Sequence, residues 1–281
     1  MATKKAVAPK KSVATSTNKK PATVTRVVTR EPREAVRYNK THRPNFTNEI
    51  NSSRYLATLV AEFIGTFTLA SAVVVLQGQP FFMLFALAGL VLMFGQISGA
   101  YLNPALALAG WATKRLTAAR ALGYVLMQVL GALLALVVIT SVMKQAPATV
   151  GAMGALAAAE PFKLGALPLG KEWFVMLGEV LGTMLFGFAV AGATREKNER
   201  VGAALTVGIG LMLGLVVGGY LASTIGGAAV LNPAVAFTLQ AFGTWSAVSW
   251  WAVGIYILGS SLGAVAGFYL YDLLARASQE K

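Results

Sequence analysis

Long apolar segments with few charged side chains dominate this chain after residue 54 and most constrain how it can fold. Six such segments span residues 55–77, 81–98, 119–143, 173–193, 201–222 and 247–275. About 20 apolar residues are enough for a helix to cross the ~30 Å hydrocarbon core of a bilayer. A soluble helical protein would interleave charges on every helix, so this pattern predicts an all-α membrane protein with six transmembrane helices.

Two shorter apolar pieces, residues 103–112 and 232–242, each begin with the tripeptide Asn-Pro-Ala. Asn is a favourable N-cap and Pro is favoured at the first helical position, so both tripeptides predict a helix start. Ten residues of helix span about 15 Å, which is half a bilayer. We therefore expect two re-entrant half-helices. The two boxes comprise Asn103, Pro104, Ala105, Asn232, Pro233 and Ala234.

The chain also repeats itself. AEFIGTFTLA at 61–70 and GEVLGTMLFG at 178–187 share Glu, two residues, Gly and Thr. Each half, 55–143 and 173–276, then holds three spans and one half-helix, with a loop at 144–172 between them. An odd number of spans per half forces opposite orientations, so we expect an inverted repeat with a site at the bilayer midplane.

Basic residues are segregated toward one end. Residues 1–54 hold 13 of the 24 Lys and Arg residues and only three acids, in a chain with a net charge of +13. Low hydrophobicity and high charge predict a disordered tail. Beside a membrane domain, we expect this tail to contact anionic lipid in preference to nucleic acid.

The remaining basic residues set the expected topology. If the tail is cytoplasmic, eight basic residues fall on that side, including the one in the last segment, 277–281, and three fall on the other. This asymmetry follows the positive-inside rule and predicts that both termini are cytoplasmic. The eight are Lys114, Arg115, Arg120, Arg195, Lys197, Arg200, Arg276 and Lys281.

The expected membrane domain lacks the cysteine and histidine side chains that many catalytic and metal sites use. The chain has no cysteine, and its one histidine, His42, lies in the tail. We expect no cofactor, no metal site and no enzyme activity. Instead, we expect the N-termini of the two half-helices to meet at the midplane, where each carries about half a positive charge. The side-chain amides of Asn103 and Asn232 lie at the same place. Such a site repels cations and orients neutral solutes.

These motifs resemble the major intrinsic protein family, the aquaporins and aquaglyceroporins. The resemblance covers residues 55–276 and is carried by AEFIGT, GQISGAYLNPALAL, RALGYVLMQVLGA, GEVLGT, LNPA at 231–234 and GAVAGFYLYD. It implies six spans, two re-entrant half-helices, one pore per subunit and a homotetramer in the plasma membrane. It also implies passage of water and small neutral solutes.

The resemblance further implies a narrow filter on the outer side of the midplane. Its four positions correspond here to Met83, Tyr220, Ala229 and Val235. The family almost always has Arg at the last position, so this filter is atypical and wholly uncharged. Between the Gly and the Leu-Asn of each box, the first box has AY and the second has AAV, and this one extra residue makes Gly219 the alternative to Tyr220.

Two acids, Glu62 and Glu179, lie inside apolar segments. Ionisable residues within the membrane are functional by default. The resemblance favours a structural role, because the equivalent acids of the family brace the loops that feed the half-helices. We favour bracing over proton relay.

Three other functions remain open. The same fold could conduct larger or less polar solutes or gases, or leak monovalent ions. It could serve as a non-conducting membrane scaffold. A secondary transporter with broken helices shares the inverted-repeat logic, but paired charges are missing near both boxes.

Overall fold

Helices account for most of the structure, a computed structural model that describes residues 49–145, 162–196, 199–244 and 247–279. All of these residues belong to one unit, residues 44–281. The expected disordered tail, up to residue 48, lies outside the described residues. So do most of the 144–172 loop and the last two residues of the chain.

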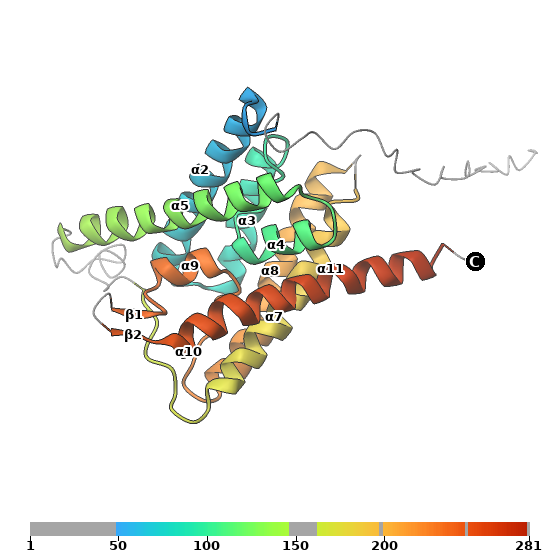
Figure 1. The fold of residues 1–281 in the computed structure, drawn as a ribbon. Coiled ribbons are helices and arrows are strands. Elements are labelled where there is room, and N and C mark those ends of the chain that lie inside the picture. Colours follow the sequence, from blue (N-terminus) through green and yellow to red (C-terminus); the bar gives the residue numbers. More distant parts are fainter. Residues whose placement is uncertain (1–48, 146–161, 197–198, 245–246, 280–281) are drawn as a thin grey trace, which may run out of the picture. The chain divides into compact units, whose positions relative to one another are not determined.

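The elements follow one another in the order shown in Figure 1. They are α2 (Ser53–Val75), α3 (Pro80–Phe94), α4 (Pro104–Ala112), α5 (Ala118–Gln145), α7 (Glu172–Ala193), α8 (Arg200–Ser223), α9 (Pro233–Thr238), β1 (Gly243–Thr244), β2 (Ala247–Val248), α10 (Trp250–Val253), η1 (Gly254–Gly259) and α11 (Ser260–Ala277). The two strands form an antiparallel hairpin that pairs Gly243 with Val248.

Five helical segments are long and apolar enough to cross a membrane: α2, α5, α7, α8 and the continuous run α10–η1–α11. The span expected at 81–98 is helical over only 15 residues, as α3. At 1.5 Å per residue it is about 22 Å long, shorter than a full span. The described residues thus follow the expected order of six apolar helices and two short ones, with α3 shorter than predicted.

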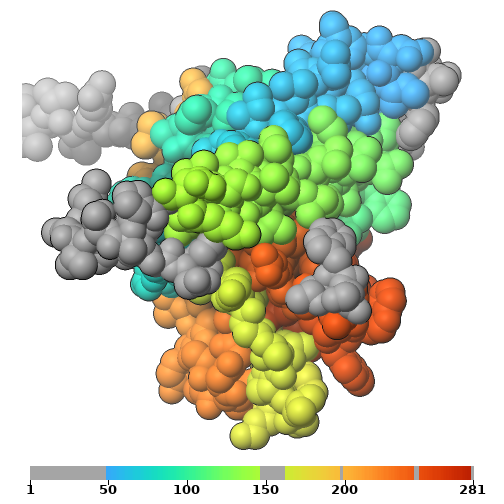
Figure 2. Space-filling model, turned by 90° about the vertical axis from the view of Figure 1, so that its left-hand side faces the viewer, coloured from blue at the N-terminus to red at the C-terminus, as the bar shows by residue number. Residues whose placement is uncertain are grey.

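Each short helix packs on the opposite half of the chain. Helix α4 contacts α5 of its own half but lies also against α11 of the second half, and Figure 1 shows it between these two helices. Helix α9 contacts α5 and α2 of the first half. The long helices α2 and α5 also pack together, seen as neighbouring blue and green surfaces in Figure 2. The two halves of the chain are therefore interlocked through their short helices.

Both short helices start as the sequence predicts. The Asn103 side-chain oxygen accepts a hydrogen bond from the Ala105 amide over 2.9 Å. The Asn232 oxygen accepts one from the Ala234 amide over 3.0 Å. In each case the Pro that follows occupies the first helical position. A backbone N–H there would have no partner within the helix, so the lack of one in proline costs nothing.

The second short helix ends earlier than expected. A helix was predicted over 232–242, but α9 stops at Thr238 because Gln240 adopts a left-handed conformation, with φ 54°. The Ala241 amide then donates back to the Ala236 carbonyl over 2.9 Å. This 6→1 bond is the Schellman ending of a helix. Lys114, with φ 62°, ends α4 in the same way.

The last span contains a π-helical segment, η1, that the sequence did not predict. Such a segment inserts an extra residue into the helical turn and leaves backbone carbonyls poorly paired. Here the Ser260 hydroxyl donates to the Tyr256 carbonyl over 2.6 Å. The distortion sits beside the loop that carries the second box, because Tyr256 contacts Ala228.

Large apolar side chains lie exposed along the outer faces of the long helices. Leu56 on α2, Leu122 on α5 and Leu262 on α11 are each about 60% exposed or more. In water such surfaces would be an aggregation hazard, whereas in a bilayer they face lipid.

Candidate functional site

The two Asn-Pro-Ala boxes meet through reciprocal hydrogen bonds. The Asn103 side-chain nitrogen donates to the Leu231 carbonyl over 2.8 Å, and the Asn232 nitrogen donates to the Leu102 carbonyl over 3.0 Å. Both Asn side chains are buried. An amide nitrogen carries two hydrogens, so each Asn keeps one further donor after making this bond. The junction is therefore both a clamp between the halves and a pair of fixed donors.

The residue before each Asn adopts an unusual backbone conformation. Leu102 has φ 47° and Leu231 has φ 60°, which places both in the left-handed region. For a bulky residue this costs about 1–2 kcal/mol and persists only where the surroundings enforce it. The conformation turns each leucine carbonyl toward the Asn of the other half. The sequence carries no signal for it.

Glycines make room for these leucine side chains. A Cβ added to Gly65 would overlap the Leu102 side chain, and one added to Gly182 would lie 2.7 Å from Leu231 Cδ2. Gly65 and Gly182 occupy matching positions in the repeat, three residues after Glu62 and Glu179 respectively. Gly65 and Gly182 thus leave space for the side chains of Leu102 and Leu231.

Glu62 accepts four different donors. The Tyr101 and Leu102 amides reach its carboxylate at 3.0 Å and 2.7 Å. The Ser98 hydroxyl and the Gln128 side-chain nitrogen reach it at 2.6 Å and 2.7 Å. Glu62 has no exposed surface, so these bonds replace the water that a buried carboxylate would otherwise lack.

Glu179 holds the second box with fewer partners. Its carboxylate accepts the Val230 amide at 2.5 Å and the Leu231 amide at 3.0 Å, and it too is fully buried. Among the described residues no side chain donates to it. Each leucine before a box is therefore held by its N–H to an acid and by its carbonyl to an Asn.

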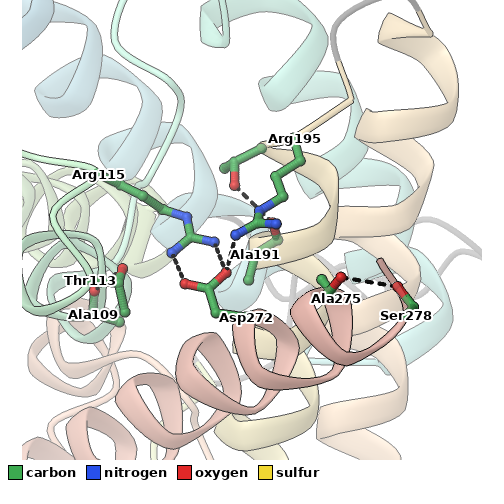
Figure 3. Close-up of polar contacts among 9 residues, drawn as sticks. Ala109, Thr113, Arg115, Ala191, Arg195, Asp272, Ala275 and Ser278 are labelled. Atoms are coloured by element: carbon green, nitrogen blue, oxygen red, sulfur yellow. Dashed lines mark hydrogen bonds and ion pairs between the residues drawn. The ribbon is translucent and has the colours of Figure 1, made fainter. Parts of the chain in front are cut away.

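The far end of α4 is fixed by a three-residue ionic cluster, Arg115, Asp272 and Arg195 (Figure 3). Arg115 contacts both oxygens of Asp272, at 3.0 Å and 2.8 Å, and Arg195 reaches one of them at 2.6 Å. Arg115 follows α4, Arg195 follows α7 and Asp272 lies on α11. The sequence reasoning used these arginines only for topology and missed the contact with Asp272.

A cavity of about 70 Å³ lies beside the second box and reaches Asn232. One water needs about 10–15 Å³ of such space, so several can fit. The side chains that line it are apolar except for Asn232. The lining residues are Leu69, Val73, Gly78, Met83, Phe162, Leu164, Leu211, Leu215, Ala228, Ala229, Val230, Asn232, Val235 and Leu239.

Three of the four residues expected in the filter line this cavity: Met83, Ala229 and Val235. The structure does not place Tyr220 with them. Its side chain is 70% exposed, on the outer face of α8. Leu211 and Leu215 of the same helix line the cavity instead.

The alternative residue, Gly219, continues the cavity-facing side of α8. Residues four apart share one face of a helix, so Gly219 follows Leu211 and Leu215 in register. A Cβ added to Gly219 would meet nothing within 4 Å. Tyr220, one residue further, is rotated by about 100° around the helix axis.

Clusters of metal-ligating side chains are absent from the described residues. They contain no group of three or more His, Cys, Asp or Glu side chains that could hold a metal ion. The two buried acids are occupied by backbone amides.

Comparisons with known proteins agree on one family. The model of the family described as "Major intrinsic protein" matches residues 49–162. A probable aquaporin of Archaeoglobus fulgidus is 33% identical over 194 residues, which cover 68% of this chain and 73% of that protein. A glycerol uptake facilitator-like protein of Lactiplantibacillus plantarum is 32% identical over 216 residues, covering 73% of this chain and 92% of that protein.

The fold agrees with a solved structure. The X-ray structure of the aquaglyceroporin from Plasmodium falciparum matches with a TM-score of 0.58 at 15% identity, over 81% of this chain and all of that one. The predicted resemblance and aquaporin-like fold are thereby confirmed. The chain is a multi-pass integral membrane protein and belongs to the major intrinsic protein family.

Proposed function

We propose that this chain is a passive membrane channel for water and small uncharged solutes. The observation that carries the proposal is the pair of reciprocally bonded boxes beside a cavity that Asn232 lines. Relatives named as aquaporins and as a glycerol uptake facilitator support the same function. No reaction and no cofactor belong to the proposal.

The midplane of this proposed channel excludes cations by its positive potential and orients neutral solutes by hydrogen bonds. Asn103 and Asn232 each have one N–H left to donate to the oxygen of a passing water or alcohol. Helix α4 adds the positive end of its dipole at Asn103. The carboxyl oxygens of Glu62 and Glu179 accept backbone amides of the loops before the boxes, and those of Glu62 also accept Ser98 and Gln128. A cation meets donors and positive potential here, whereas a neutral solute gains hydrogen bonds.

The outer filter is proposed to consist of Met83, Gly219, Ala229 and Val235. Val235 stands where the resembled family has Arg, so the filter offers neither a fixed charge nor guanidinium donors. Selection there rests on size and polarity, and cation exclusion falls on the midplane.

A second candidate has support from the same cavity. Its lining side chains are apolar up to Asn232, which favours solutes less polar than glycerol, or dissolved gases. The same pore could also leak monovalent ions, because the outer filter has no positive charge to repel cations. Flux assays with a graded series of solutes separate these possibilities.

Assembly and placement are proposed from the resemblance and the charge pattern. We place the chain as a homotetramer in the plasma membrane with both termini cytoplasmic. The basic residues after α4 and around the α7–α8 turn would lie on the cytoplasmic side. The basic tail would contact anionic lipid, and nucleic acid is not a proposed partner.

Stopped-flow light scattering on proteoliposomes tests the function. Shrinkage in an impermeant osmolyte measures water flux, and re-swelling in glycerol or urea measures solute flux, with a proton-sensitive dye to report leakage. Water flux well above that of empty liposomes is expected. Flux equal to empty liposomes, from correctly folded protein, would favour a non-conducting scaffold instead.

A further inference from the structure

Residues 162–164 form a strap that is anchored on two sides of the cavity of about 70 Å³. The Leu164 amide donates to the Leu239 carbonyl over 2.9 Å, one residue beyond the end of α9. The Phe162 ring lies against Gly78, in the turn between α2 and α3, where an added Cβ would lie 3.2 Å from Phe162 Cε1. Gly78 and Leu239 both line the cavity, so the strap connects one half of the chain to the other beside it.

The strap also borders a second cavity, of about 210 Å³. Phe162 and Leu164 line both cavities, and so does Ala228, in the loop before the second box. Lys163, between the two apolar residues, lines only the larger cavity. Residues shared by two cavities lie at their boundary. We call this boundary, made of Phe162, Leu164 and Ala228, the neck.

The neck borders the space beside the atypical filter residue, Val235. Val235 is 3% exposed and lines the smaller cavity together with Phe162 and Leu164. Valine has neither the length nor the donors of the arginine that the resemblance implies at this position, so it narrows the cavity less. The strap adds a phenyl and an isobutyl side chain to the same cavity. Apolar bulk is thus present where the filter lacks a guanidinium group.

We propose that the neck is a second selectivity element, in series with the filter, and that Phe162 and Leu164 set the size limit that Val235 does not. The inference rests on the proposed channel function. The three neck side chains have no hydrogen-bonding group, so a hydroxyl or amide group that passes between them loses hydration without a replacement from these side chains. The disfavoured solutes are therefore polyols and amides, which are broader than water and carry several such groups. Hydrated ions are disfavoured at an apolar constriction as well.

Phe162→Ala and Leu164→Ala test the neck by flux, with Leu169→Ala as the matched control. Leu169 lies further along the same segment, is 93% exposed and lines neither cavity. We expect each neck variant to raise the ratio of glycerol to water permeability by about tenfold, the factor that corresponds to leaving one hydroxyl group hydrated. The control should keep the wild-type ratio, and thermal midpoints of all variants report whether folding is intact.

A labelling experiment tests the neck without relying on flux. The chain has no cysteine, so Ala229→Cys and Ala166→Cys each introduce a single thiol. Ala229 lines only the smaller cavity and Ala166 only the larger one, so the two thiols lie on opposite sides of the neck. A methanethiosulfonate reagent added outside the vesicles should modify the Ala229→Cys thiol faster once Phe162→Ala is present. The rate at the Ala166→Cys thiol should stay unchanged.

The compensation for the missing arginine has its own test. Adding Val235→Arg to Phe162→Ala should lower the glycerol-to-water ratio again, because a guanidinium group would occupy space that the phenyl ring leaves. A ratio that stays raised in this double variant would overturn the view that the two positions share one task.

The outcomes separate the neck from the channel function. Absence of wild-type water flux would overturn the channel function, and the labelling rates would still report on the neck. An unchanged glycerol-to-water ratio together with unchanged labelling of Ala229→Cys, in both Phe162→Ala and Leu164→Ala, would overturn the neck. An equal rise in the Leu169→Ala control would also overturn it, because the effect would then belong to the segment in general.

Discussion

The Asn103 side-chain nitrogen lies 2.8 Å from the Leu231 carbonyl oxygen, and Asn232 repeats this contact with Leu102 at 3.0 Å. Each half of the chain thus supplies the donor for a carbonyl of the other half. Removal of either Asn leaves a buried carbonyl without its partner, which costs about 1–3 kcal/mol. The half-helices are held as a pair, and neither box is complete alone.

Asn232→Asp should both destabilise the protein and raise cation passage. Asp still accepts the Ala234 amide but has no donor for the Leu102 carbonyl, and its charge opposes the positive potential of the midplane. We expect a loss of about 1–3 kcal/mol in the free energy of unfolding and increased potassium flux in liposomes. Asn51→Asp, at an exposed position, is the control. Unchanged cation flux would contradict the midplane mechanism.

Glu62→Gln should be more destabilising than Glu179→Gln. Glu62 accepts two backbone amides and two side-chain donors, whereas Glu179 accepts two backbone amides. Bonds to a charged acceptor are worth about 1.5–3 kcal/mol against about 1 for neutral ones, so each lost charge weakens every bond. Unfolding midpoints in the same detergent measure the difference. Equal losses would mean that the Ser98 and Gln128 contacts add nothing.

The sequence predicted the parts of the fold that depend on local chemistry. Apolar length located the helices, and Asn followed by Pro located the starts of α4 and α9. The Glu-x-x-Gly-Thr repeat pointed to matching halves. These features rest on capping, propensity and hydropathy, which act within a few residues.

Features that depend on tertiary contacts were not predictable. The left-handed Leu102 and Leu231 are enforced by partners 40 or more residues away, Glu62 and Asn103 among them. The early end of α9 depends on the conformation of Gln240, a residue with no special preference for it. Tyr220 and Gly219 are adjacent, so a one-residue uncertainty in alignment decides which face of α8 is assigned to the filter, and the sequence left both residues open.

Gly65→Ala should destabilise the first box. The new methyl group would overlap the fully buried Leu102 side chain, and overpacking of this kind costs about 1–3 kcal/mol. Gly89→Ala on α3 is the control, because a Cβ there meets nothing within 4 Å. It should stabilise by about 0.5–1 kcal/mol through helix propensity. The double variant Gly65→Ala with Leu102→Ala should lose less than the sum of the single losses.

Asp272→Asn should weaken the attachment of the C-terminal end of α4 to α11. Asn cannot compensate the two guanidinium charges of Arg115 and Arg195, whose side chains both face Asp272 (Figure 3). Arg115→Lys should cause a smaller loss, because it keeps the charge but not the two-point contact. A double-mutant cycle measured by thermal unfolding gives the coupling between the two sites. A coupling near zero would mean that Arg115 does not anchor α4 through Asp272.

Val235→Arg should restore a charged, narrow outer filter. Val235 is 3% exposed and lines the cavity of about 70 Å³ together with Met83 and Ala229, so a guanidinium group would occupy much of that space. It would also add donors and a positive charge at the outer side of the midplane.

The consequence should differ between solutes. We expect glycerol and urea flux to fall more than water flux, and any proton leak to fall as well, because the added charge repels cations before they reach Asn232. Val235→Leu, which adds bulk without charge, is the control for size alone. Reduced proton leak in Val235→Arg but not in Val235→Leu would assign the effect to charge. Equal loss of water and glycerol flux in a normally folded Val235→Arg variant would mean that Val235 does not set the size limit of the pore.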